Sequence, residues 1–306
     1  MLMQSCRSCI NTISLPFPGV ESFCRNLEKV AGTKHFTLGE DEIKLSYDSI
    51  IIFGAWHPIY ETLLNKIPNK KGVLWTSSAG EMDFTPNSVE ILYLTKILNL
   101  LDEGVIDFIL FTDPNLYHVF KRDNVFHIPC PVKIPPPKNK EKVDGISFFQ
   151  PPKITKNIYN NLLAVKLVQK ELPLKLYTNL KPYEEVIKNL GIEYEMFDWL
   201  PEEEYFDLIS KMKVNLAAFW CGEYFNYQVV EAALLGTESV VSKNAEYYPF
   251  NYSKVQNLDN PVEIAEKIRI VLKHQFVNIR LVMIHKCEIW NADVVAHLST
   301  ERFIYK

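Results

Sequence analysis

Short apolar runs alternate with longer segments of helical periodicity along the chain. Residues 49–53 and 214–219 are largely apolar and of strand length, which is typical of strands buried on both faces of a parallel sheet. Residues 87–101 and 201–212 instead carry apolar side chains at helical spacing, and further helices are predicted over 114–120 and 261–273. Because strand and helix alternate throughout, the pattern favours an α/β fold over a sandwich or a helical bundle.

One proline-rich stretch interrupts this alternation. Residues 129–145 hold five prolines and four lysines, and a proline lacks the N–H that a helix or a sheet ladder needs. The segment can therefore form neither a helix nor an inner strand, and we predict an exposed linker. The boundary between two domains is placed here, with residues 1–137 in the first and 138–287 in the second.

In the second half, polar residues gather after a predicted strand. The strand 214–219 is followed by a loop, by Asn226, which is a good N-cap residue, and by a helix over residues 227–235. Gly236 stands where the C-terminal cap of a helix needs a positive φ, and a further strand follows at 238–242. Ligands of α/β proteins bind beyond the carboxyl ends of strands, so this loop is the main candidate for chemistry.

Glu223 lies on the loop and Glu231 in the second turn of the predicted helix, with seven residues between them. Both side chains can therefore contact a ligand bound at the same site. Two glutamates at this spacing could simply be solvated surface carboxylates, but the residues around them make the pattern more specific. The whole stretch resembles the Glu-x7-Glu signature of retaining glycosyltransferases of the GT-B fold, particularly family 4. Asn226 and Glu238 stand where that signature has Gly and Pro. The matching residues are Glu223, Tyr224, Phe225, Glu231, Ala232, Gly236 and Thr237.

The resemblance implies two Rossmann-like α/β domains that face each other across a cleft. Residues 1–137 would form the acceptor-side domain, and residues 138–287 would bind a nucleotide-sugar donor. Residues 288–306 resemble the family's last helix, which packs back on the first domain. The implied reaction is metal-independent transfer of a hexose-type sugar with retention at the anomeric carbon. The acceptor (a glycan, a lipid or a protein), the base, the sugar and the oligomeric state stay open.

The resemblance also assigns roles to residues of the second domain. Glu231 would accept hydrogen bonds from the donor ribose, and Glu223 would act at the transferred sugar as the catalytic residue. The donor-binding set is completed by Tyr224, Phe225 and Asn226, and the amino end of the helix 227–235 would help to stabilise the departing diphosphate.

A lysine and an arginine contact the diphosphate in the family, and only the lysine has a clear counterpart here. Lys156 matches it, whereas Gln150 or Pro151 stands near the arginine position. Lys153 could substitute, because an ammonium on a flexible stem needs less strict placement than a bidentate guanidinium.

The first domain offers candidates after its own strands. Residues 9–15 are predicted as a strand and 16–21 as a turn into a helix over 22–30. Gly19 stands in this turn, where GT-B enzymes have a Gly-rich approach to sugar or phosphate, so the resemblance implies that Gly19 binds the donor; an ordinary turn fits as well. After the strand 49–53, Trp56 is a candidate stacking surface and His57 a candidate acceptor-side residue; a histidine that caps the following helix fits equally well.

The loop after a strand at 72–75 adds three acceptor-side candidates, although its composition would also suit an ordinary loop. They are Ser77, Ser78 and Glu81.

Charge and hydropathy limit the classes of partner that the sequence predicts. The 33 basic and 37 acidic residues give a net charge of -4, and basic clusters such as 138–142 are short, so the sequence does not predict nucleic-acid binding. The amino terminus lacks the features of a signal peptide, and no run approaches the roughly 20 apolar residues of a membrane span. We expect a cytoplasmic protein that can contact a membrane only peripherally. No cofactor or metal is expected, because the second half lacks an Asp-x-Asp motif and the nucleotide-sugar is itself a substrate.

Two alternatives remain at this point. A nucleotide-sugar epimerase of the same fold would convert the donor without any acceptor. A non-catalytic member that only binds sugar or nucleotide is suggested by the missing arginine.

Overall fold

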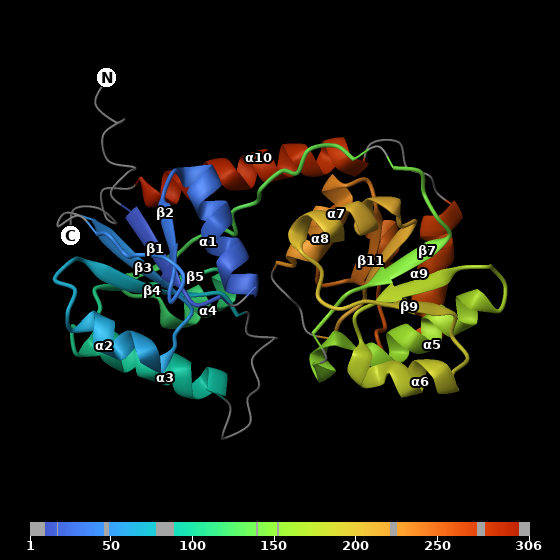
Figure 1. Cartoon of the computed structure of the whole chain (residues 1–306), viewed down its shortest axis with the longest axis horizontal. Helices are drawn as coiled ribbons and strands as arrows, with labels where there is room; N and C mark the ends of the chain where they lie inside the picture. Colours follow the sequence, from blue (N-terminus) through green and yellow to red (C-terminus); the bar gives the residue numbers. More distant parts are fainter. Residues whose placement is uncertain are drawn as a thin grey trace. The chain divides into compact units, whose positions relative to one another are not determined.

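A computed structural model of the chain describes residues 10–16, 18–45, 49–77, 89–138, 140–151, 153–220, 225–273 and 279–299. The chain divides into two compact units, which we call unit 1 (Met1–Lys133 with Cys287–Lys306) and unit 2 (Ile134–Lys286). Each unit is built on one parallel six-stranded sheet with helices packed against it (Figure 1). The predicted α/β class is therefore confirmed.

The sheet of unit 1 has the strand order β2-β1-β3-β4-β5-β6, and every pairing is parallel. The order reverses between β1 and β3, because β2 lies on one side of β1 and all later strands lie on the other. The strands are β1 (Ile10–Ser14), β2 (Lys34–Thr37), β3 (Ile50–Gly54), β4 (Lys71–Trp75), β5 (Phe108–Phe111) and β6 (Val125–His127).

The apolar core of unit 1 combines β-branched and aromatic residues of the strands with leucines of the helices that cover the sheet. Helix α4 begins where local signals predict, since Pro114 occupies its first turn and the Asp113 carboxylate accepts the N–H of Asn115 at 2.8 Å. The helices and 3-10 turns are α1 (Pro18–Ala31), η2 (Pro58–Tyr60), α2 (Glu61–Leu64), α3 (Val89–Asp102) and α4 (Pro114–Phe120).

Unit 2 has the strand order β12-β11-β10-β7-β8-β9, again parallel throughout. Counted along the unit, this is the Rossmann order 3-2-1-4-5-6, with its reversal between β7 and β10. The strands are β7 (Gly145–Phe148), β8 (Lys175–Thr178), β9 (Tyr194–Met196), β10 (Val214–Ala217), β11 (Glu238–Ser242) and β12 (Lys254–Val255).

Helices lie on both sides of this sheet, with α7 and α8 on one side and α5 and α6 on the other (Figure 1). Helix α5 packs along α9, and α7 packs along α8. The helices and 3-10 turns of unit 2 are η3 (Ile154–Lys156), α5 (Ile158–Gln169), η4 (Lys181–Tyr183), α6 (Glu184–Asn189), α7 (Glu202–Lys211), α8 (Tyr227–Leu234), η5 (Asn251–Ser253) and α9 (Pro261–Lys273).

Three features differ from the sequence predictions. Helix α1 begins at Pro18 and not at Ser22, because proline suits the first turn of a helix, so Gly19 lies inside that turn and not before it. Helix α10 (Ile279–Leu298) starts nine residues before position 288; its apolar residues do not gather on one face, which hides its start from a periodicity argument. The linker is only partly exposed, since Cys130 and Val132 are buried.

Helix α10 contributes to both units, because the boundary at Lys286 falls within it. In unit 1, the side-chain amide of Asn291 makes two hydrogen bonds to the main chain of Val132. Its oxygen accepts the N–H at 2.9 Å and its nitrogen donates to the carbonyl at 2.8 Å. This pair explains why the proline-rich segment is buried at Val132, since both of its main-chain polar groups there are satisfied.

Candidate functional site

In an open parallel sheet, a ligand binds beyond the carboxyl ends of the strands at the point where the strand order reverses. In unit 2 that point lies between β7 and β10. The predicted donor-binding lysines follow β7, and Phe219 and Asn226 follow β10. The fold thus brings to one sheet edge two loops that are about 70 positions apart in the sequence.

Lys156 is the last residue of η3 and is held in place at this edge. Only 5% of its surface is exposed, and its ammonium lies 4.8 Å from the centroid of the Phe219 ring, two residues beyond β10. A cation over an aromatic face is attracted by the ring quadrupole. Lys153, by contrast, is exposed. The structure therefore places one fixed and one exposed ammonium on the predicted donor side.

Three asparagines at the start of α5, which we call the asparagine clamp (Asn157, Asn160 and Asn161), join the two loops. The clamp donates to the carbonyl of Ala218, beyond β10, and to that of Leu258, beyond β12. Sequence reasoning missed the clamp. The i, i+3, i+4 spacing of three amide side chains after a strand is the signal that could have indicated it.

Gln150 stands near the place where the resembling family has arginine. Its side chain is buried and donates from Nε2 to the Oε1 of Gln228 in the first turn of α8, while its main-chain N–H donates to Asn179 Oδ1 at 2.9 Å. A neutral amide bridge therefore connects the end of β7 with α8. No guanidinium takes its place among the described residues of this edge.

The start of α8 agrees with its prediction. Asn226 accepts the N–H of Val229 at 3.3 Å as the N-cap, and Gly236 beyond the helix has φ of 79°. The ring of Phe225 lies between those of Tyr227 and Tyr247, with centroid distances of 5.1 and 5.4 Å. This fixes the entry of the chain into the helix. Glu223 and Tyr224 lie outside the described residues.

Glu231 is half-buried in the second turn of α8, beside α7. The hydroxyl of Tyr205, on α7, is buried and has no hydrogen-bond partner among the described residues. Burial raises the pKa of Tyr205, and the charge of Glu231 raises it further. The Tyr205 hydroxyl therefore stays protonated near the Glu231 carboxylate.

The candidates of unit 1 follow its own reversal point, between β1 and β3. His57 comes after β3, and its Nδ1 accepts the N–H of Ile59 at 3.3 Å as the N-cap of η2. Its acceptor-side role stays a prediction. Trp56 is not a stacking surface, because it is 4% exposed and packs edge-on against Tyr60. Ser77 is half-buried after β4, while Ser78 and Glu81 lie outside the described residues.

Backbone strain occurs at both reversal points. Among the residues that the structure describes, the non-glycine ones with positive φ are Ala55, at 52°, directly after β3, and Asn157, at 51°, in the connection that follows β7. A left-handed conformation costs free energy for a residue with a Cβ, and such residues persist only where the surrounding structure holds them. The strain at Ala55 and Asn157 therefore marks the loops at the carboxyl edges of the two sheets as candidate functional segments.

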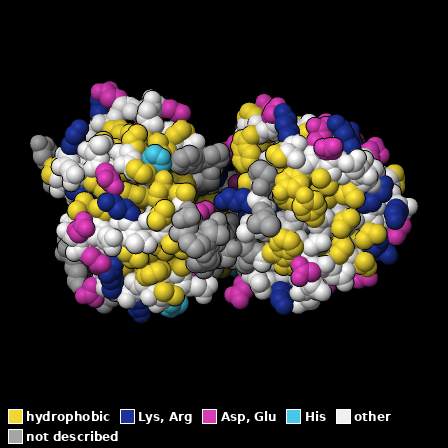
Figure 2. Space-filling view, turned by 90° about the horizontal axis from the view of Figure 1, so that it is seen from below, with side chains coloured by type: hydrophobic (Ala, Val, Ile, Leu, Met, Phe, Trp, Pro, Cys, Tyr) yellow, Lys and Arg dark blue, Asp and Glu magenta, His cyan; other side chains and the backbone are white. Residues whose placement is uncertain are grey.

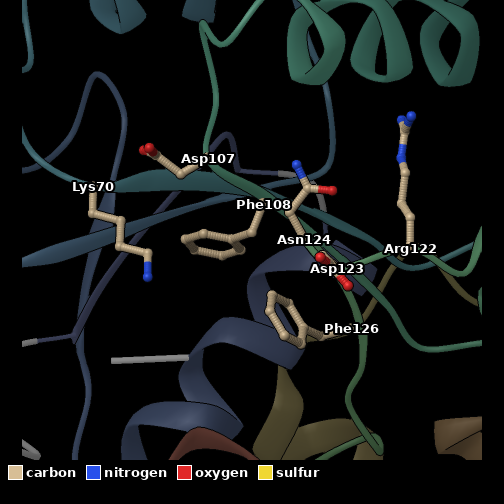
Figure 3. Close-up of a pocket in the computed structure, with 7 residues that line it drawn as sticks. All are labelled: Lys70, Asp107, Phe108, Arg122, Asp123, Asn124 and Phe126. Carbon is tan, nitrogen blue, oxygen red and sulfur yellow. The ribbon is translucent and has the colours of Figure 1, made fainter. Parts of the chain in front are cut away.

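A cavity of about 500 Å³ lies elsewhere, at the opposite edge of the sheet of unit 1 (Figure 3). Three of its residues, Lys70, Asp107 and Asn124, directly precede or adjoin the first residues of β4, β5 and β6, which places it at the amino ends of these strands. Two of its charged groups have partners within the protein: the Asp107 carboxylate accepts the N–H of Lys71, and Arg122 pairs with Asp102. None of the predicted site residues is among those that line it, so we do not assign the candidate site to this cavity.

The surface is of mixed character. Seen from below, both units show hydrophobic side chains interspersed with charged groups of both signs (Figure 2). Within the described part of the chain, no group of three or more His, Cys, Asp or Glu side chains is placed to hold a metal ion. None of the helices that the structure describes is long and apolar enough to cross a membrane.

No protein-family model matches the sequence, and a search of curated proteins found no match. Solved structures do match in fold. The pneumococcal O-GlcNAc transferase GtfA, in complex with UDP and GlcNAc, has a TM-score of 0.62 at 13% identity, covering 82% of this chain and 56% of that one. A variant of S. aureus TarM, in complex with fondaparinux, α-GlcNAc-glycerol and UDP, has a TM-score of 0.59 at 14% identity, covering 86% and 55%.

The chain thus spans little more than half the length of these two proteins. A UDP-forming α,α-trehalose-phosphate synthase from Burkholderia xenovorans matches over nearly its whole length, with a TM-score of 0.60 at 12% identity and coverage of 95% of this chain and 98% of that one. Identities this low establish the fold alone. With two Rossmann-like domains, the chain has the GT-B fold.

Proposed function

We propose that the protein is a retaining glycosyltransferase that takes a sugar from a UDP-sugar donor bound by unit 2. The observation that carries this proposal is the burial of Lys156 at the reversal point between β7 and β10, beside the Phe219 ring. A buried ammonium at the place where α/β proteins bind ligands suits an anionic ligand. The solved structures of the same fold that contain UDP, or form it, support a nucleoside diphosphate as that ligand.

The proposed chemistry is mainly electrostatic. When the bond to the sugar breaks, negative charge develops on the departing UDP. Lys156 and the positive dipole at the amino end of α8 would stabilise this charge. Both are held before the donor arrives, Lys156 by burial and α8 by its Asn226 cap, so little reorganisation is needed. Glu231 would bind the ribose and Glu223 would act at the transferred sugar.

A second candidate, a protein that binds the donor without turning it over, is favoured by one observation. The neutral bridge between Gln150 and Gln228 lies where the resembling family has a guanidinium. An amide carries no net charge, so it stabilises a developing anion less than an arginine does. Activity and binding therefore have to be measured separately.

The first experiment uses the whole chain. Calorimetry with UDP should detect binding, and incubation with UDP-glucose or UDP-N-acetylglucosamine should release UDP in the presence of EDTA, because lysine and a helix terminus replace a cation. Binding without release would favour the non-catalytic alternative. Conversion of the sugar without release of UDP would indicate an epimerase, and rescue by Mg²⁺ would contradict the metal-independent mechanism. Absence of UDP binding would overturn the proposed function.

Glu231→Ala should weaken UDP binding about tenfold, because a hydrogen bond to a charged group contributes about 1.5 kcal/mol or more. The loss of affinity should arise only from the missing hydrogen bonds to the ribose hydroxyls. We therefore expect the 2′,3′-dideoxy form of UDP to bind parent and variant almost equally. Glu185→Ala, at an exposed position of α6, is the matched control and should leave both affinities unchanged. An equal loss for both ligands would show that Glu231 does not contact the ribose.

A further inference from the structure

The asparagine clamp lies directly beside the proposed diphosphate lysine. Asn157 follows Lys156, is fully buried and has a left-handed backbone, with φ of 51° and ψ of 41°. Its Nδ2 donates to the carbonyl of Ala218 at 3.2 Å and to that of Leu258 at 2.8 Å. One amide thus connects the start of α5 with the loops beyond β10 and β12.

The other two asparagines hold Asn157 in this conformation. Asn160 Nδ2 donates to Asn157 Oδ1 at 2.9 Å, which fixes the orientation of the Asn157 amide. Asn161 Nδ2 donates at 2.9 Å to the carbonyls of both Asn157 and Ala218, and more weakly at 3.3 Å to that of Lys156. The carbonyls on either side of the strained peptide unit are therefore both engaged.

The same connection is reinforced through the main chain. The N–H of Trp220 donates to the carbonyl of Thr155 at 3.2 Å, so the residue that precedes Lys156 is tied to the residue that follows Phe219. Bonds on both sides of Lys156 thus link its backbone to the segment that carries the Phe219 ring. This arrangement explains how a long, flexible lysine side chain keeps its ammonium over that ring, at 4.8 Å.

We propose that Asn157 is a positioning residue, which holds Lys156 at the diphosphate site by joining the start of α5 to the loop beyond β10. The inference rests on the proposed function, since it assigns Lys156 to the diphosphate. Asn157 itself need not touch the ligand. Preorganisation of this kind lowers the cost of ordering the lysine when the ligand binds.

The test is a double-mutant cycle in the full chain, read out by calorimetry with UDP and with uridine. Asn157→Ala should weaken UDP binding about tenfold and leave uridine binding within about twofold, because uridine lacks the phosphates that Lys156 would contact. In a Lys156→Met background, adding Asn157→Ala should change UDP affinity by less than about twofold, since a residue that acts only through Lys156 has nothing left to position.

Asn157→Gly is a second variant that separates loss of the amide from misfolding, because glycine adopts the left-handed conformation without strain but lacks the amide. It should lose UDP affinity as Asn157→Ala does, whereas Asn189→Ala, exposed at the end of α6, should lose none. Parent-like binding by Asn157→Gly, additive losses in the cycle or an equal loss for uridine would overturn the inference and leave the proposed function standing. A parent that fails to bind UDP would overturn both.

Discussion

Lys156→Met should weaken UDP binding about 10- to 100-fold, the largest loss that we expect from a single substitution in unit 2. Methionine is also long and unbranched but uncharged, so the substitution removes the ammonium that lies over the Phe219 ring. Hydrogen bonds to charged groups contribute about 1.5–3 kcal/mol, and about 1.4 kcal/mol corresponds to a factor of ten in affinity. Because the ammonium is buried, solvent screens it little, which places the effect in the upper part of that range.

The measurement is calorimetric titration of parent and variant with UDP and with uridine. Uridine should bind both proteins within about twofold, since it carries no phosphate. Lys153→Met is the matched control, because Lys153 lies three residues earlier on the same connection but is exposed. We expect it to cost less than about threefold. If Lys153→Met costs more than Lys156→Met, the exposed lysine is the one that contacts the diphosphate.

Glu238→Gln should stabilise the protein at alkaline pH by about 1–3 kcal/mol and have no effect near pH 4. Glu238 begins β11, is only 7% exposed, and its Oε1 has no hydrogen-bond partner among the described residues. Burial raises the pKa of its carboxyl from 4.5 to about 7, and the Tyr252 hydroxyl opposes part of that rise. A raised carboxyl pKa means that folding favours the protonated form.

The sign follows from the two pKa values. Below pH 4.5 the carboxyl is protonated in both the folded and the unfolded chain, so it costs nothing. As pH rises from there to about 7, the unfolded chain ionises first and the folded state loses stability relative to it; above about pH 7 the loss is constant. Glutamine, which does not ionise, removes this loss while keeping the shape of the side chain.

Thermal transitions of parent and variant at pH 4, 6 and 8 measure the effect, with about 2–4 °C expected per kcal/mol for a domain of this size. Glu141→Gln, at an exposed position before β7, is the control and should shift the transition by less than about 1 °C. If Glu238→Gln gives the same shift at pH 4 as at pH 8, folding does not change the pKa of the carboxyl and the burial argument fails.

Elements with strong local signals were predictable from the sequence. The helices 114–120 and 261–273 and the strand 238–242 have the predicted bounds. Both helices begin at a proline that follows an Asp or Asn, and the strand follows a glycine with φ of 79°. Such signals act within a few residues, so no knowledge of the tertiary structure is needed to recognise them.

Errors arose where the deciding interaction is not local. Trp56 looked like an exposed ring after a strand, but packing against Tyr60 buries it. The proline-rich segment looked fully exposed, but Asn291, 159 positions away, satisfies the main chain of Val132. A sequence pattern contains the residue that will be buried but not the distant partner that buries it.

By itself the sequence determined the α/β alternation, the Asn226 cap, the glycine after α8 and the lysine that follows β7, because each depends on neighbours in the chain. Only the tertiary structure decided which loops meet. Strand order sets the reversal points and therefore brings Lys156 to Phe219, and it distinguishes Lys156, which is buried, from Lys153, which is not. The asparagine clamp depends on the same order, since its acceptors at Ala218 and Leu258 lie 61 and 101 positions from Asn157. Pairing between strands is non-local, and for that reason the site could be nominated from the sequence but assembled only by the fold.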